Sequence, residues 1–232
     1  GANFDLNPFS KEEEELIGLN TNFRNSLFFN RGKQHHSTTY SFLINESQNL
    51  LSVGSVAAKN QSHQVQYKHL VKKSWLFNFS GSTTKTESTS ENYPNRNFEI
   101  DGYQIEPKIG YLFSKNASWD IFYEFQQKEN QIGAFETLKQ TRLGTSFTFN
   151  SEKGFSMNGE FSMYNNSYDG NALSAVGFQM LEGLQPGKNQ TWRLLLQKNL
   201  TQYLDVNINY QGRNSETSKT IHTGNVQLRA FF

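Results

Sequence analysis

The amino-acid sequence predicts an all-β fold, an antiparallel up-and-down transmembrane β-barrel of about 12 strands, within a range of roughly 10 to 14. Apolar and polar residues alternate along most of the chain, and the connections between the alternating segments are short and long in turn. Aromatic residues are also abundant, although the mean hydropathy is only -0.70. A strand places successive side chains on opposite faces, so sustained alternation indicates a sheet with one apolar and one polar face.

Composition narrows the class of protein. The 232 residues suffice for one large domain or two small ones, and 35% of them are hydrophobic. No apolar run approaches the ~18–20 residues that a membrane-spanning helix needs. Aromatic residues make up 14% of the chain, whereas a disordered polar chain would be poor in them. A barrel with an apolar outer surface and a water-filled interior accounts for both the low hydrophobic content and the high aromatic content.

The net charge, the cysteine content and the first residues restrict the possible functions further. The net charge of +1 gives no basic excess, so we expect no nucleic-acid partner. Cysteine is absent, which excludes disulfides, thiolate catalysis and cysteine-based metal sites. The chain starts at Gly1-Ala2 without an initiator Met or a signal peptide. We interpret this start as a mature end, a cloning remnant or a cut within a longer protein.

The alternation is clearest from residue 103 onward. The predicted strands there have these apolar rows: Tyr103–Phe113, Trp119–Phe125, Leu143–Phe149, Phe155–Met163, Trp192–Leu200, Leu204–Tyr210 and Gly224–Phe232. Charged, amide and hydroxyl side chains occupy the intervening positions. Period-two alternation over so many segments predicts strands rather than helices.

The first third of the chain alternates less regularly. Its expected strands are Leu19–Phe29, Tyr40–Ile44, Leu51–Ala57, Val65–Val71 and Trp75–Phe79. Taking Leu51–Ala57 as a strand, with Glu46–Asn49 as its turn, gives about 12 strands in total. An even number places both termini on the periplasmic side. We therefore expect residues 1–15 to be an N-terminal periplasmic segment and residues 16–232 to be the barrel.

The connection lengths support the same arrangement. The expected short turns are Lys72–Ser74, Ser114–Ser118, Ser151–Gly154 and Thr201–Tyr203. The expected longer connections are Lys85–Asn97, Gln127–Glu136, Asp169–Lys188 and Asn214–Lys219. Bacterial barrels have short periplasmic turns and longer extracellular loops, so the short turns are predicted to be periplasmic.

A soluble antiparallel protein also alternates, but it turns its apolar face inward. Many Trp, Tyr, Phe and Met side chains would then have to fill one interior, which is physically awkward. With the polar face inside, charges of both signs line a wet lumen and the aromatic residues near strand ends form an interfacial girdle. The charged residues predicted to face the lumen are Arg24, Lys68, Glu106, Lys108, Asp120, Glu124, Arg142, Glu160, Arg193, Asp205, Arg213 and Arg229.

The end of the chain carries a family resemblance. Gly224, Val226, Leu228, Ala230 and Phe232 form one apolar face that ends on an aromatic residue. This strand, together with the segments 97–103 and 179–187, resembles bacterial outer-membrane β-barrels of the Bacteroidota type, including the C-terminal barrel region of a larger protein. The resemblance implies an integral protein of the bacterial outer membrane, in contact with its lipid and lipopolysaccharide. It also implies that the barrel-assembly machinery reads Phe232, Ala230 and Leu228 during insertion.

Catalytic and metal sites are weakly indicated, and we predict no catalytic residue, no cofactor and no metal. The candidate for catalysis is a pair of His222 with Ser215 or Ser218, but Ser is abundant in this chain, so such a pair is expected by chance. The adjacent His35 and His36 in a polar hairpin are more simply solvated. The same holds for the carboxylate run Glu12–Glu15, for which partner docking or calcium binding is the alternative.

The long connection Asn171–Lys188 is unusual for an exposed loop because much of it is apolar. Its apolar residues predict a lumenal plug or a partner surface, and they are Leu173, Phe178, Met180, Leu181 and Leu184. The resulting hypothesis is a non-enzymatic barrel that serves as a membrane-anchored component of a transport, secretion or assembly complex, with protein partners. The alternatives are a free-standing diffusion pore for small solutes and a barrel-embedded lipid or peptide hydrolase.

Overall fold

The computed structural model describes residues 18–31, 35–51 and 54–230. These residues form eleven strands, a single-turn 3-10 helix η1 (Pro94–Arg96) and a short α-helix α1 (Ala175–Leu181). The strands are β1 (Gly18–Phe29), β2 (His36–Leu51), β3 (Gly54–Val71), β4 (Trp75–Ser90), β5 (Phe98–Ser114), β6 (Ala117–Asn130), β7 (Thr137–Ser151), β8 (Phe155–Asp169), β9 (Gly187–Thr201), β10 (Leu204–Ser215) and β11 (Ser218–Ala230).

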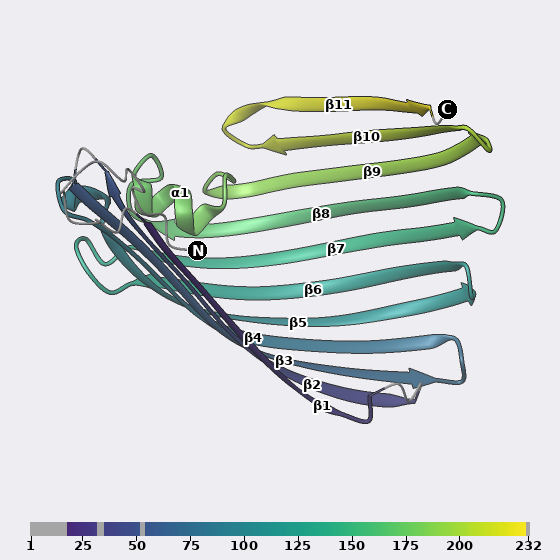
Figure 1. Ribbon diagram of the computed structural model, residues 1–232, viewed down its shortest axis with the longest axis horizontal. Helices are drawn as coiled ribbons and strands as arrows, with labels where there is room; N and C mark the ends of the chain where they lie inside the picture. Colours follow the sequence, from purple (N-terminus) through teal and green to yellow (C-terminus); the bar gives the residue numbers. More distant parts are fainter. Residues whose placement is uncertain (1–17, 32–34, 52–53, 231–232) are drawn as a thin grey trace, which may run out of the picture.

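All the described strands belong to one sheet in which each strand pairs with the next one along the chain (Figure 1). Every pairing is antiparallel, from β1 with β2 to β10 with β11. The predicted all-β, antiparallel up-and-down fold is therefore confirmed. The described sheet is curved but not closed, because β1 and β11 form its two edges.

The connections sort into the two ends of the sheet. The turns 72–74, 115–116, 152–154 and 202–203 lie at the end where β11 finishes, which we call the short-turn end. The connections 91–97, 131–136, 170–186 and 216–217 lie at the opposite, long-loop end. The predicted alternation of short and long connections is thus confirmed from β3 to β10. It fails at the last connection, because 216–217 is a two-residue turn where the longer Asn214–Lys219 was expected.

One predicted strand is wrong. Glu46–Asn49 is no turn but part of β2, where Glu46 pairs with Lys59 and Asn49 with Val56 of β3. Leu51–Ala57 therefore divides between the end of β2 and the start of β3, and β3 continues without a break to Val71. The polar run from Lys59 to Gln64 interrupts the apolar pattern but not the strand, since the sheet extends beyond its apolar part.

The described residues consequently give eleven strands where the sequence predicted about 12. With an odd number, β1 and β11 run in the same direction: β1 begins at the long-loop end and β11 finishes at the short-turn end. The two ends of the described sheet therefore do not share one side, as the expected even number would require. The proposed periplasmic segment 1–15 lies outside the described residues.

Candidate functional site: the polar inner face and its helix

The sheet has two chemically different faces, and α1 packs on one of them, which we call the inner face. The strand register places every charged residue that was predicted to face the lumen on this inner face. For example, Lys68 is opposite Asn78, which is opposite Lys108. In the same way Glu160 is opposite Arg193. A few apolar side chains, such as Leu43, Leu76 and Leu195, share this mainly polar face.

The centre of the inner face carries a row of alternating charges built around Arg142. The Arg142 Nη1 atom lies 3.3 Å from Glu124 Oε2, and its Nη2 atom lies 2.6 Å from Glu160 Oε1. Arg193 Nη2 lies 3.6 Å from the other oxygen of Glu160. With Glu106 and Lys108, whose charged atoms are 3.9 Å apart, these residues form what we call the charge belt.

A buried aromatic ring holds the belt in place. The Phe122 ring lies under the Arg142 guanidinium, 4.6 Å from its carbon, and 5.2 Å from Lys108 Nζ. Such cation–π contacts orient both cations toward the space above the sheet. The ring fits because Gly144 lies directly opposite Phe122. A Cβ atom at that position would stand only 2.3 Å from the Phe122 Cζ atom.

The long connection between β8 and β9 forms α1 through a local cap and through packing. The Ser174 side chain accepts a hydrogen bond from the Gly177 amide at 3.0 Å, and the helix ends at Glu182 in the left-handed conformation. A helix of seven residues is too short to be stable alone, so its packing against the sheet must stabilise it. Its buried apolar side chains are Val176, Met180 and Leu181, which join Ile100 and Leu138 of the sheet in one apolar cluster.

Polar contacts also bind this connection to the inner face. Lys128 Nζ donates to the Met180 carbonyl at 3.1 Å and lies 2.5 Å from Glu182 Oε1. Arg213 Nη1 donates to the Gly183 carbonyl at 3.1 Å, and Asn166 Nδ2 donates to the Gln185 carbonyl at 3.0 Å. The connection therefore lies across the long-loop end of the inner face, as Figure 1 shows for α1.

The structure separates the apolar residues that were predicted to form a plug or a partner surface. Met180 and Leu181 are buried against the sheet, and Leu184 is half-buried. Leu173 and Phe178 point away from the cluster and are 94% and 70% exposed. The sequence indicated the apolar character of this connection, but nothing in it showed which residues would be covered.

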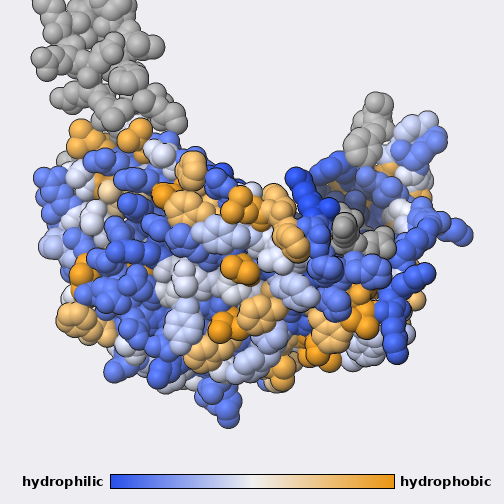
Figure 2. Space-filling view, turned by 90° about the horizontal axis from the view of Figure 1, so that it is seen from below, coloured by the Kyte–Doolittle hydropathy of each residue, from blue (hydrophilic) through white to orange (hydrophobic). Residues whose placement is uncertain are grey.

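The outer face is divided into an apolar and a polar zone. Toward the short-turn end its rows are apolar, and on β5 and β6 they include Ile105, Ile109, Ile121 and Trp119, all more than 40% exposed. Apolar side chains also reach the surface at many points in the space-filling view, in which the molecule is hollowed at the top (Figure 2).

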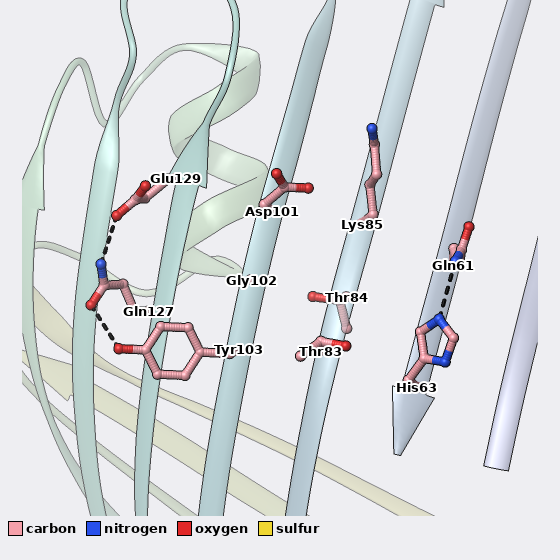
Figure 3. Close-up of a pocket in the computed structure, with 10 residues that line it drawn as sticks. All are labelled: Gln61, His63, Thr83, Thr84, Lys85, Asp101, Gly102, Tyr103, Gln127 and Glu129. Atoms are coloured by element: carbon pink, nitrogen blue, oxygen red, sulfur yellow. Dashed lines mark hydrogen bonds between the residues drawn. The ribbon is translucent and has the colours of Figure 1, made fainter.

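Toward the long-loop end the outer face becomes polar and holds a hollow of about 420 Å³ (Figure 3). There the Tyr103 hydroxyl donates to Gln127 Oε1 at 3.0 Å, and Gln127 Nε2 donates to Glu129 Oε1 at 2.6 Å. Lys85 Nζ lies 2.6 Å from Glu99 Oε1. The strands therefore continue past the apolar zone into a surface suited to water.

Other residues considered from the sequence are placed apart from the charge belt. His222 lies on the outer face, with Nδ1 2.8 Å from the Tyr210 hydroxyl. The Ser215 and Ser218 hydroxyls bond to each other at 2.6 Å. His36 Nε2 contacts the Asn30 side chain. Of the assembly-signal residues, Leu228 and Ala230 lie on the outer face of β11. Phe232 and Glu12–Glu15 lie outside the described residues.

Two features are absent from the described part of the chain. It holds no group of three or more His, Cys, Asp or Glu side chains arranged to bind a metal ion. None of its helices is long and apolar enough to cross a membrane.

The fold and the inner face define the chain as an up-and-down antiparallel β-sheet protein with a charged inner wall. No protein-family model matches the sequence, and no curated protein matches it. Among solved structures, it is similar in fold to the KdgM porin in complex with disordered oligogalacturonate. That match has 9% identity and a TM-score of 0.38, and covers 92% of this chain and 100% of the porin.

Two further solved structures are similar in fold. The siderophore receptor PiuA from Acinetobacter baumannii matches with 7% identity and a TM-score of 0.47 over 91% of this chain, which spans 45% of the receptor. The translocator domain of the autotransporter NalP from Neisseria meningitidis matches with 10% identity and a TM-score of 0.42, over 93% of this chain and 82% of that domain.

Proposed function

We propose that this chain forms an integral β-barrel of the bacterial outer membrane and acts as a diffusion pore for small polar solutes. The observation that carries the proposal is the inner face, where partly exposed charges and amides lie in place of a continuous apolar core. A wet lumen tolerates such a wall, whereas a dry interior would make unpaired charges costly. This puts the pore, one of the alternatives from the sequence, ahead of the complex component.

The apolar zone of the outer face has the height that a membrane requires. On β5 it runs from Tyr103 to Phe113. At ~3.3 Å per residue this row is about 33 Å long, and a strand tilt of ~35–45° reduces its height to about 25 Å. That height equals the apolar band of outer-membrane barrels. Lipid would contact this zone, and the polar outer zone would lie at the level of the lipopolysaccharide headgroups.

Other parts of the proposal rest on the sequence resemblance alone. They are the Bacteroidota type, membership in a larger protein and recognition of the end of β11 by the barrel-assembly machinery. The periplasmic side is assigned to the short-turn end on the general rule for bacterial barrels.

Single-channel recording in planar bilayers tests the pore. Folded protein, identified by its heat-modifiable migration on gels, should give discrete conductance steps in KCl. Unfolded protein at the same concentration is the control. Folded and inserted protein that passes no current would overturn the pore while leaving the membrane location intact.

The second candidate is a component of a transport, secretion or assembly complex. It is favoured by one observation, the strong exposure of Leu173, just before α1, and of Phe178, within α1. Apolar side chains exposed together at a loop mark contact surfaces for partners. Native mass spectrometry of the protein, extracted in mild detergent, should then show a partner that the Leu173→Ser, Phe178→Ser variant loses. Phe135→Ser, in another connection at the same end, is the matched control.

A further inference from the structure

A cavity of about 440 Å³ lies on the inner face of β8 to β11, beside residues 182–184 that follow α1. Its polar lining includes Arg193, Arg213, Thr191, Gln211 and Thr223. Every one of these side chains belongs to the inner face by register, so they point to the same side of the sheet. The cavity adjoins the charge belt and shares Glu160 and Arg193 with it.

The two arginines are diagonal neighbours across the β9–β10 pair. Arg193 is opposite Gln211, and Arg213 is opposite Thr191. Side chains in diagonal positions on one face are ~7–8 Å apart at their bases and reach each other when they are long. Both guanidinium groups can therefore contact the same small ligand.

Two carboxylates, Glu160 and Glu182, also line the cavity, but each is paired mainly with a cation other than Arg193 and Arg213. Glu160 lies 2.6 Å from Arg142 but 3.6 Å from Arg193. Glu182 lies 2.5 Å from Lys128. Arg213 donates to a backbone carbonyl, and the Arg193 side chain is 56% exposed. The donors of the two arginines are thus only partly used.

We propose that this cavity is an anion subsite of the pore, in which a small multivalent solute bridges Arg193 and Arg213 through carboxylate or phosphate groups. The planar fork of each guanidinium suits bidentate binding of either group. Thr191, Gln211 and Thr223 supply hydrogen-bonding groups for hydroxyl substituents of the same solute. The proposal rests on the proposed pore function and names its solute class.

Blocking of the KCl current by citrate and by inorganic phosphate tests the subsite. Either anion should reduce the wild-type current at a concentration at least about tenfold lower than in the R193Q, R213Q double variant. R229Q is the matched control, because Arg229 also lies on the inner face but at the short-turn end, outside this cavity. The anions should block the R229Q current at the same concentration as the wild-type current. Block by only one of the two anions supports the subsite and identifies the group that it prefers.

Calorimetry with the detergent-solubilised protein separates this inference from the pore itself. Citrate or phosphate binding that is lost in the double variant supports the subsite even where the wild type carries no current. A conducting wild type that neither binds nor is blocked by these anions overturns the subsite and leaves the pore. Equal loss of binding in R229Q also overturns the subsite. Binding would then depend on the overall positive potential of the inner face and not on this cavity. If the R193Q, R213Q variant fails to fold, R193K, R213K replaces it, because it keeps both charges. The R193K, R213K variant should bind the anions with intermediate affinity.

Discussion

The Arg142 guanidinium contacts two carboxylates, one hydroxyl and two aromatic rings on the two strands that flank β7. Its most buried charged partner is Glu124, whose side chain is only 8% exposed. Removing a cation from a buried pair leaves the carboxylate without compensation, which costs more than the pair itself contributes. At the residue scale, Arg142 is therefore the position at which the inner face is most sensitive to substitution.

We expect Arg142→Met to lower the free energy of unfolding by about 2–3 kcal/mol, less than for a fully buried pair because Glu160 remains half-exposed. Urea titration in lipid vesicles, followed by the heat-modifiable gel shift, measures this change. Lys115→Met is the control, since the Lys115–Glu152 pair at the short-turn end is exposed on both sides. Equal unfolding midpoints for the two variants would show that the charge belt does not contribute to stability.

Substitution of Gly144 tests whether the Phe122 ring needs the space that this glycine leaves. A Cβ atom there would meet the ring at 2.3 Å and the Ser162 hydroxyl at 2.9 Å, so Gly144→Ala must displace Phe122 from beneath Arg142. Overpacking of this kind costs roughly 1–3 kcal/mol. Gly224→Ala is the matched control, because nothing lies within 4 Å of its added Cβ. Unfolding midpoints in urea should fall for the first variant only; a fall in neither would contradict the packing described here.

At the scale of elements, α1 depends on Lys128, which joins β6 to the Met180 carbonyl and to Glu182. We expect Lys128→Met to loosen the connection 170–186, because Glu182 and the end of the helix lose their anchor. Limited proteolysis should cleave this connection faster, and the pore should show a higher conductance. Lys139→Met, at an exposed position on the outer face of β7, should change neither. Unchanged cleavage in Lys128→Met would mean that the apolar cluster alone holds α1.

The elements differ in how well the sequence predicted them. β5 to β11 were predicted because their apolar rows alternate with few interruptions, such as Lys198 in β9. β2 and β3 were misread near Glu46–Asn49, where the sheet leaves the apolar zone and polar residues no longer mark a face. The helix α1 was not predicted as a helix, since a segment of seven residues becomes helical through contacts with Ile100 and Leu138, distant in sequence.

At the scale of the whole molecule, alternation predicted which side chains share a face, because that depends only on counting along each strand. It could not predict which charges meet. The pairing of Arg142 with Glu124 and Glu160 depends on the register of three strands. The cavity with Arg193 and Arg213 depends on where residues 182–184 lie, and neither feature leaves a pattern along the chain.

The orientation of the two faces is itself open to a direct test, because the chain contains no cysteine that would react in the background. Asp120 lies on the inner face and Ile121, its neighbour in β6, on the outer face. With the protein in lipid vesicles, Asp120→Cys should react with a water-soluble maleimide through the wet lumen. Ile121→Cys should stay unlabelled, because lipid excludes the reagent. Both should react equally in urea-unfolded protein. Labelling of Ile121→Cys at the rate of Asp120→Cys in vesicles would indicate a sheet that does not span the membrane, and protection of Asp120→Cys alone would indicate a soluble protein with this face inside.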